Sequence, residues 1–271
     1  MLGKTIISKS GTGCTSHSSC AISSFLSFNL SPQILQKSHF NEVSRDRWVA
    51  AKAKLIAPGS SILDMGAGSC PYRRHFAHCD YKTQDFTALK GEQLRAGSYG
   101  QIDFICDITS IPAESSSFDM VLCTEVLEHV PEPIKALQEM SRILKPGGHL
   151  LLTAPLGSGI HQDPHHYYGG YTPYWYQRFL TQADFEMIEI FPNHGFFRFF
   201  AQESIRFLRL SNPFQGDLGF GKVIWLPFWL FFLPFFGFFI PLISISLDQL
   251  DKDKNFTVGY HVTARKKYTA M

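Results

Sequence analysis

Ile62-Leu63-Asp64-Met65-Gly66-Ala67-Gly68 is the stretch that decides the fold of this chain. Apolar residues lead into a carboxylate and then into two glycines, which is typical of a buried strand ending in a tight turn. Glycines leave the backbone open to a ligand, and the start of a following helix offers unpaired N–H groups. A dinucleotide fingerprint requires a third glycine where this chain has Pro71, so the pattern disfavours NAD and predicts another small polar ligand.

Carboxylates recur at the ends of two further predicted strands. Asp85 follows Tyr-Lys-Thr-Gln, and Asp107 follows Ile-Asp-Phe-Ile-Cys. A single acid before a glycine turn is commonly a cap or turn residue. A series of three, counting Asp64, meets at one edge of a parallel sheet and suits a cationic, ribose-bearing ligand.

These motifs, with those that follow them, resemble the class I S-adenosylmethionine-dependent methyltransferases, in particular the methyltransferase type 11-like family. The matching segments are 62–68, 85–86, 107–108, 118–131 and 144–155. The resemblance implies an enzyme with S-adenosylmethionine as cofactor. It implies that Gly66 and Gly68 line the methionine end, that Asp85 accepts hydrogen bonds from the ribose and that Asp107 and Ile108 contact the adenine. The candidate cofactor-binding residues are Asp64, Gly66, Ala67, Gly68, Asp85, Phe86, Asp107, Ile108, Thr124 and Glu125. This family often has a glycine where Cys70 stands, which affects only local helix packing.

Strands and helices alternate along the middle of the chain. We expect strands near 61–65, 81–86, 102–107, 118–124 and 148–154, a helix over 134–144, and one or two helices between Pro32 and Ile56. Segment 185–191 pairs with a last strand over 256–267. The alternation predicts an α/β fold with a parallel sheet covered on both faces. The resemblance implies the fuller fold class: a Rossmann-like, doubly wound, seven-stranded, mostly parallel sheet with an antiparallel last strand, plus a hydrophobic helical insertion before it. The predicted divisions are a disordered segment 1–30, a cofactor-binding core 31–191, a membrane-associating insertion 192–254, and the last strand with its tail, 255–271.

Composition limits the partners and the compartment. The chain has 271 residues and a formal charge of +2, and its core lacks a basic run with interleaved aromatics, so we expect no nucleic-acid partner. Six scattered cysteines without a C-x-x-C pair favour reduced thiols in the cytoplasm. Cys70, His75, His78 and Cys79 match no zinc-ligand spacing. Serines interrupt the apolar residues of the acid-poor N-terminal segment, which favours disorder over an export signal.

A polar and aromatic loop follows Pro155 and is the expected acceptor side. His161 and His165 are the candidate catalytic bases, because histidine exchanges protons near neutral pH. The alternative is that these histidines bond to backbone carbonyls and order the loop. His161, Asp163, His165 and His166 could also be imagined as metal ligands, but no partner at a familiar spacing follows, so we predict no metal.

Two segments on either side of this loop are expected to have structural roles. Glu128 and His129 are expected to cap and pack the helix after the fourth strand, since Pro131 and Pro133 mark its entry. The Tyr-Trp-Tyr run after Thr172-Pro173 is the expected start of a helix on the sheet.

An uncharged apolar stretch over 223–247 is long enough to cross a bilayer. Pro227, Pro234 and Pro241 interrupt it, and the strands on either side of it must pair with each other. We therefore expect a broken hairpin entering one leaflet, or an in-plane element, with a peripheral or monotopic protein as the result. Nearby arginines and Lys222 suit an anionic lipid surface. A homodimer or a docked partner protein is the rival use of this surface, and a buried cap on the domain is the structural alternative.

Two functions follow from these features. The first is a methyltransferase acting at the membrane face on a small or lipid-linked acceptor. Thr124-Glu125-Val126-Leu127 stands where amino-group methyltransferases carry an asparagine-proline-proline type motif, which favours an oxygen or carbon acceptor. The second is a non-catalytic, membrane-associated binding or assembly module with the same fold.

Overall fold

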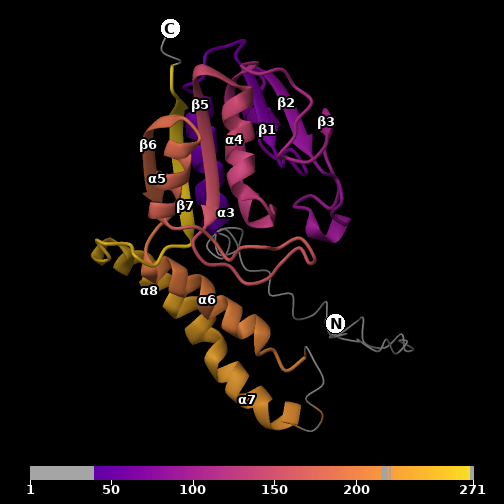
Figure 1. Cartoon of the computed structure of the whole chain (residues 1–271). Helices are drawn as coiled ribbons and strands as arrows, with labels where there is room; N and C mark the ends of the chain where they lie inside the picture. The colour runs from indigo at the N-terminus through magenta and orange to yellow at the C-terminus, as the bar shows by residue number, and fades with distance from the viewer. Residues whose placement is uncertain (1–39, 215–218, 220, 269–271) are drawn as a thin grey trace, which may run out of the picture. The chain divides into compact units, whose positions relative to one another are not determined.

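The computed structural model describes residues 40–214, 219 and 221–268, and a seven-stranded sheet lies at its centre (Figure 1). Its strands are β1 (Ser61–Met65), β2 (Asp80–Asp85), β3 (Phe104–Ile105), β4 (Phe118–Thr124), β5 (Leu144–Pro155), β6 (Phe185–Pro192) and β7 (Gly259–Lys266). They are ordered β3-β2-β1-β4-β5-β7-β6. The pairs among β1 to β5 are parallel, and β7 runs antiparallel to both β5 and β6. This arrangement confirms the predicted fold class.

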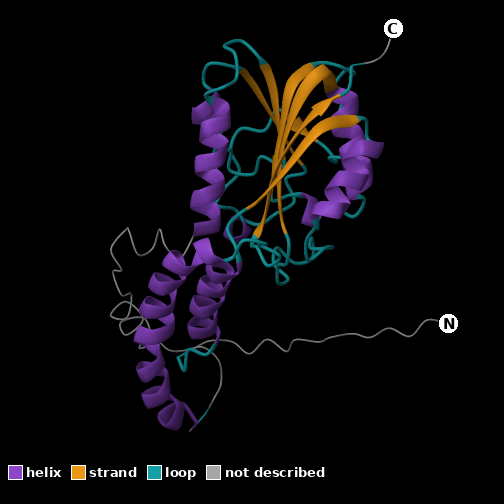
Figure 2. Cartoon of the chain, turned by 90° about the vertical axis from the view of Figure 1, so that its left-hand side faces the viewer, coloured by secondary structure: helices purple, strands orange, loops and turns teal. Residues whose placement is uncertain are grey.

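Helices cover both faces of the sheet (Figure 2). They are α3 (Phe40–Ala53), α4 (Pro133–Ile143) and α5 (Pro173–Gln182), with short 3₁₀ turns η1 (Arg73–Phe76), η2 (Gly91–Gln93) and η3 (Leu127–His129). Leu137 of α4 and Tyr176 of α5 belong to one buried cluster, while Val49 of α3 and Phe76 of η1 belong to the cluster on the other face. Burial on both faces explains why the central strands are almost continuously apolar.

Two helix starts follow from capping rules. Pro133 is at the first position of α4, as the sequence predicts, because a missing N–H costs nothing there. The Thr172 side chain accepts a hydrogen bond from the backbone N–H of Trp175 and caps α5. The expected helix at the Tyr-Trp-Tyr run is therefore confirmed.

The third strand is much shorter than the predicted 102–107. Only Phe104 and Ile105 pair with β2. Just before them, the Asp103 carboxylate accepts hydrogen bonds from both the N–H and the hydroxyl of Thr83, at 2.9 Å each. The Asp103 N–H also donates to the Thr83 carbonyl at 3.1 Å, so the segment is held at the sheet edge without forming a longer strand.

The insertion between β6 and β7 is a helical hairpin. One arm is α6 (Phe196–Leu210); the other joins α7 (Gly221–Pro234), the π-helical turn η4 (Phe235–Phe239), α8 (Ile240–Leu247) and the 3₁₀ turn η5 (Asp248–Leu250) (Figure 1). The expected broken hairpin within 223–247 is wrong, because this stretch stays one helix. Its three prolines, seven residues apart, lie on about one side, and the wider η4 turn follows Pro234 and accommodates the lost hydrogen bonds.

Hydrogen bonds join the two arms along their length. The Trp225 and Trp229 indoles donate to the carbonyls of Ser211 and Leu208, at 2.7 and 3.0 Å. At the other end, the Asp248 carboxylate accepts from the N–H groups of Gly195 and Arg198, which caps the start of α6. The hairpin is thus a defined element rather than two independent helices.

The hairpin leaves and rejoins the sheet at the carboxyl edge of the parallel strands. Pro155, at the end of β5, is opposite Gly259 at the start of β7, and Pro192, at the end of β6, is opposite Tyr260. Ligands of open α/β sheets bind at this same edge.

Candidate active site

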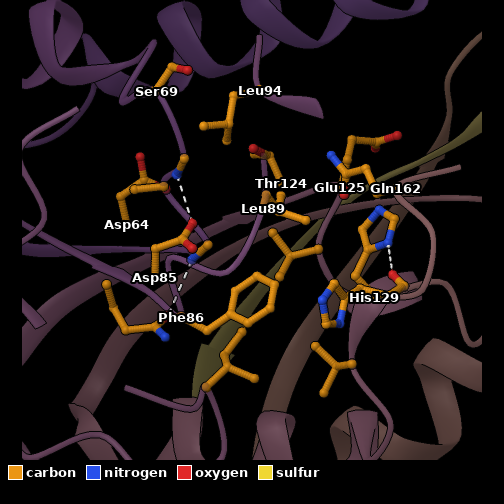
Figure 3. Close-up of a pocket in the computed structure, with 18 of the residues that line it drawn as sticks. Asp64, Ser69, Asp85, Phe86, Leu89, Leu94, Thr124, Glu125, His129 and Gln162 are labelled. Atoms are coloured by element: carbon orange, nitrogen blue, oxygen red, sulfur yellow. Dashed lines mark hydrogen bonds between the residues drawn. The ribbon is translucent and has the colours of Figure 1, made fainter. Parts of the chain in front are cut away.

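A cavity of about 350 Å³ opens at the carboxyl ends of β1, β2 and β4 (Figure 3). Among its lining residues are all of the predicted cofactor-binding residues: Asp64, Gly66, Ala67, Gly68, Asp85, Phe86, Asp107, Ile108, Thr124 and Glu125. The structure therefore brings together side chains from four separate motifs. Their individual contacts with a cofactor stay predictions.

The glycine turn after β1 is required by its surroundings. Gly66 has φ +70°, and a Cβ at this position would overlap the Val126 side chain. Its N–H donates to the Gln84 carbonyl at 2.9 Å, so the turn is held against the end of β2. Only glycine combines this backbone conformation with so close an approach.

Asp85 connects this turn to the second strand end. One carboxylate oxygen accepts from the Gly68 N–H and the other from the Thr87 N–H, both at 2.9 Å. A carboxylate has about four acceptor positions, so Asp85 retains capacity for a pair of hydroxyl donors from a ligand. In Figure 3 its side chain and that of Asp64 lie on the same side of the pocket.

Asp64 is the most perturbed carboxyl in the cavity. It is buried and accepts a hydrogen bond from the Tyr81 hydroxyl. Burial raises its pKa to about 7, and the nearby Asp85 charge acts in the same direction, while the Tyr81 bond and Arg73 oppose the shift. A positively charged ligand next to Asp64 would stabilise its ionised form.

Asp107 differs from these two acids because it is exposed. It accepts hydrogen bonds from the N–H and hydroxyl of Thr109, at 2.8 and 2.6 Å, and so also has the local turn role described above. Next to it, Ile108 is buried and contributes apolar surface to the cavity.

The opposite wall includes two residues that the sequence did not predict, Arg45 and Tyr72. The predicted residue Glu125 accepts a hydrogen bond from the Thr153 hydroxyl at 2.8 Å and lies 3.5 Å from the guanidinium of Arg45, on α3. Arg45 also donates to the Tyr72 hydroxyl at 3.1 Å. Both Arg45 and Tyr72 line the cavity. The only available signal was the expectation of a helix before the first strand, which gives no particular residue a role.

The loop over 156–172, here named the acceptor loop after its predicted role, closes the pocket from the other side. The Gln93 and Gln162 side-chain amides each donate to the other segment's backbone, at 3.1 Å, which joins this loop to η2. The backbone carbonyl of Glu128 accepts from the N–H groups of Tyr167 and Tyr168. Glu128 is itself buried, which agrees with its expected packing role.

The histidines divide between the pocket and the loop. His165 lines the cavity and meets the Phe86 ring edge-on, with centroids 5.1 Å apart. His161 is exposed, does not line this cavity, and donates from Nδ1 to the Gly159 carbonyl at 2.9 Å. His129, expected only to pack, also lines the cavity, opposite Asp64 and Asp85 (Figure 3).

Comparison with known proteins explains this pocket. Residues 63–152, which run from the glycine turn into β5, match the family model described as a methyltransferase domain. The chain contains a class I S-adenosylmethionine-dependent methyltransferase domain. The predicted family and its cofactor are thereby confirmed.

Curated relatives are similar to part of this chain. Demethylmenaquinone methyltransferase of Renibacterium salmoninarum is 35% identical over 116 residues, which are 41% of this chain and 48% of that protein. Ubiquinone biosynthesis O-methyltransferase of Xanthomonas campestris pv. campestris is 32% identical over 114 residues, covering 39% and 46% of the two chains. The chain spans about half the length of the curated relatives it matches.

Among solved structures, the crystal structure of the 4+2 cyclase SpnF is similar to this chain, with a TM-score of 0.50 and 17% identity. The similarity covers 83% of this chain and 81% of that one. At this identity it shows the fold alone.

The residues present fit S-adenosylmethionine. Asp64 is a buried carboxyl whose ionised form a sulfonium or ammonium group would favour. Asp85 has acceptor capacity for a pair of ribose hydroxyls, and Phe86 and Ile108 offer apolar surface for a base.

Proposed function

We propose that this chain transfers a methyl group from S-adenosylmethionine to an oxygen or carbon atom of a small or lipid-linked acceptor at the cytoplasmic face of a membrane. The observation that carries the proposal is the shared edge: the pocket, the acceptor loop and the apolar hairpin all meet at the carboxyl ends of the strands. An acceptor held by the hairpin would therefore reach the donor without crossing the sheet.

The donor side supports transfer rather than mere binding. When bound, the cofactor supplies an electrophilic methyl group, and the protein has to align the nucleophile and remove a proton from a hydroxyl acceptor. The acids of the first two strand ends and the glycine turn hold one side of the cavity. The opposite side carries His129 and the acceptor loop, so an acceptor entering there faces the donor.

His165 is the proposed general base. It lines the cavity, and its ring contacts Phe86, which borders the predicted adenosine site. His161, the other predicted base, donates a hydrogen bond to a backbone carbonyl and does not line the cavity; its ring centroid is 4.7 Å from that of His129. A direct role in proton removal therefore fits His165 better than His161.

The hairpin supports a membrane location. The helix over Gly221–Leu250 is long and apolar enough to cross a membrane, yet only 11% of its most apolar stretch is buried. A core helix would be mostly buried, so the alternative of a buried cap does not describe this segment. Arg206 of α6 lies against Gly159 of the acceptor loop, which connects the hairpin to the acceptor side. The names of the two curated relatives refer to menaquinone and ubiquinone, which favours an acceptor with apolar character.

The first test is the affinity for S-adenosylmethionine of Asp85→Ala, measured by calorimetry. We expect a loss of tenfold or more, about 1.4 kcal/mol, because the ribose hydroxyls would lose their acceptor. Asp80→Ala, at the exposed amino end of the same strand, should bind like the wild type. The melting temperature of each variant is measured together with its affinity, because the Asp85 carboxylate also accepts hydrogen bonds from the Gly68 and Thr87 N–H groups. This measurement separates a lost ligand contact from a loss of folding.

Turnover separates the enzyme from the non-catalytic module. Release of S-adenosylhomocysteine when the wild type is supplied with membrane lipid extract would establish transfer. Cofactor binding without release in any extract would favour the module, and the absence of cofactor binding by folded protein would refute the proposal.

A further inference from the structure

Three histidines from separate positions in the chain meet beside the pocket. His129 comes from η3, and His161 and His166 come from the acceptor loop. Each offers a ring nitrogen within 4.8 Å of those of the other two. The ring centroids of the pairs are 4.6 to 5.5 Å apart. Nitrogens that share a tetrahedral zinc ion, at about 2.0–2.1 Å from it, lie roughly 3.4 Å apart, so a small side-chain adjustment would bring the three together.

Backbone carbonyls orient two of these rings for coordination. Nδ1 of His129 donates to the His165 carbonyl, and Nδ1 of His161 donates to the Gly159 carbonyl at 2.9 Å. A carbonyl oxygen only accepts, so the proton of each neutral ring is on Nδ1 and the lone pair is on Nε2. Metal-binding histidines are held in this way by a bond from the other ring nitrogen.

The third ring, His166, lacks hydrogen bonds. Within the described part of the chain, both of its ring nitrogens are buried and neither has a hydrogen-bond partner. Buried polar atoms without partners are rare in folded proteins, and a bound ion or water is among their ordinary explanations. This observation is independent of the clustering and of the carbonyl bonds.

The electrostatics favour neutral rings. Burial lowers the pKa of His129 to about 4, and the neighbouring histidines add to that effect while the bond to His165 opposes it. Burial and His161 also lower the pKa of His166. Neutral imidazole is the form that binds a metal ion.

We propose that His129, His161 and His166 bind one divalent transition-metal ion, zinc by the chemistry of an all-imidazole site, with an open fourth position beside the pocket. This set differs from the one considered from the sequence, because His129 replaces Asp163 and His165. Three protein ligands and an open position are typical of catalytic rather than structural zinc.

The role of the ion rests on the proposed function, although its binding does not. A hydroxyl oxygen of the acceptor takes the open position, which lowers the pKa of the hydroxyl, and its proton passes to His165. The oxygen then forms the bond to the methyl carbon while the carbon–sulfur bond breaks, and the bonding pair stays on sulfur. The products are the methyl ether and S-adenosylhomocysteine.

The test measures zinc binding by the tag-free full chain, by titration and by metal analysis after dialysis. We expect about one zinc ion per chain, with His161→Ala weakening its binding roughly a hundredfold or more. His161 is exposed, so its removal does not open the core. His149→Ala removes another exposed histidine, on β5, and should bind zinc like the wild type. Cobalt(II) in place of zinc should give the absorption of a tetrahedral site, which His161→Ala should abolish.

Cofactor affinity, measured on the same samples, separates the two proposals. Zinc binding that is absent, or that His161→Ala does not change, overturns the metal site even if S-adenosylmethionine binds normally. Zinc binding with no affinity for S-adenosylmethionine upholds the site and refutes the proposed function.

Discussion

Asp64→Asn is expected to weaken S-adenosylmethionine binding roughly a hundredfold at pH 8, a loss of about 2.7 kcal/mol. The substitution keeps the shape of the side chain and an oxygen that accepts from the Tyr81 hydroxyl, but it removes the charge next to the cationic ligand. Calorimetric titration at pH 8 measures the effect. Binding of the variant at wild-type strength would show that Asp64 does not contact the charged part of the cofactor.

The pH dependence of wild-type binding gives a second readout of the same substitution. Because the pKa of Asp64 is about 7, the wild type must release a proton when a cation binds below that pH. Its affinity should therefore fall about tenfold per pH unit below pH 7, and the Asn variant should lack this dependence. Asp119→Asn is the matched control, since that carboxylate holds Ser61 and Lys145 at the amino ends of the strands, far from the pocket.

Stability should change in the opposite direction to affinity. The pKa of Asp64 rises on folding from 3.8 to about 7, so its contribution to folding is fully present below pH 3.8 and is lost as pH rises through 7. This difference corresponds to about 4 kcal/mol at most. Without cofactor at pH 8, the Asn variant should melt at a higher temperature than the wild type. A carboxyl that strengthens ligand binding but lowers the stability of the ligand-free protein has a functional rather than a structural role.

The sequence predicted the donor side of the site well for a physical reason. Strands of a parallel sheet end at a common edge, so a carboxylate placed last in each strand has its position set by the strand itself. Met65 is opposite Gln84, and Asp85 is opposite Ile105, which brings the three strand ends together. The glycine turn adds a backbone conformation that other residues rarely adopt.

The acceptor side could not be predicted to the same extent. His129 lies on a short 3₁₀ turn and His166 in an irregular loop, so no periodicity indicates that their rings meet. Arg45 reaches the pocket from a helix that sequence patterns identify only as a cover. The apolar insertion was recognised from its composition, but its pairing with α6 depends on specific bonds such as that of Trp229 to Leu208.

The largest effect outside the pocket is expected from Phe228→Ser, Phe231→Ser and Phe235→Ser combined. These side chains follow one face of the long helix and are 44 to 60% exposed. If that face enters the acyl region of a bilayer, losing the three rings removes about 3 kcal/mol of apolar burial, and vesicle binding should fall roughly a hundredfold. Flotation with vesicles of anionic and neutral lipid measures the loss, and arginines of α6 should make anionic vesicles the better partner.

The matched control replaces three exposed apolar residues of the core, Leu55, Ile105 and Tyr174, by serine. It removes comparable exposed surface but should float like the wild type, because those positions are separate from the hairpin. Both triple variants should keep wild-type affinity for S-adenosylmethionine, since none of the six residues lines the pocket.

Sedimentation tests the alternative that the hairpin is a dimer interface. A wild-type dimer that the phenylalanine substitutions dissociate, together with no flotation, would make this face an interface between two copies and would remove the membrane from the proposed function.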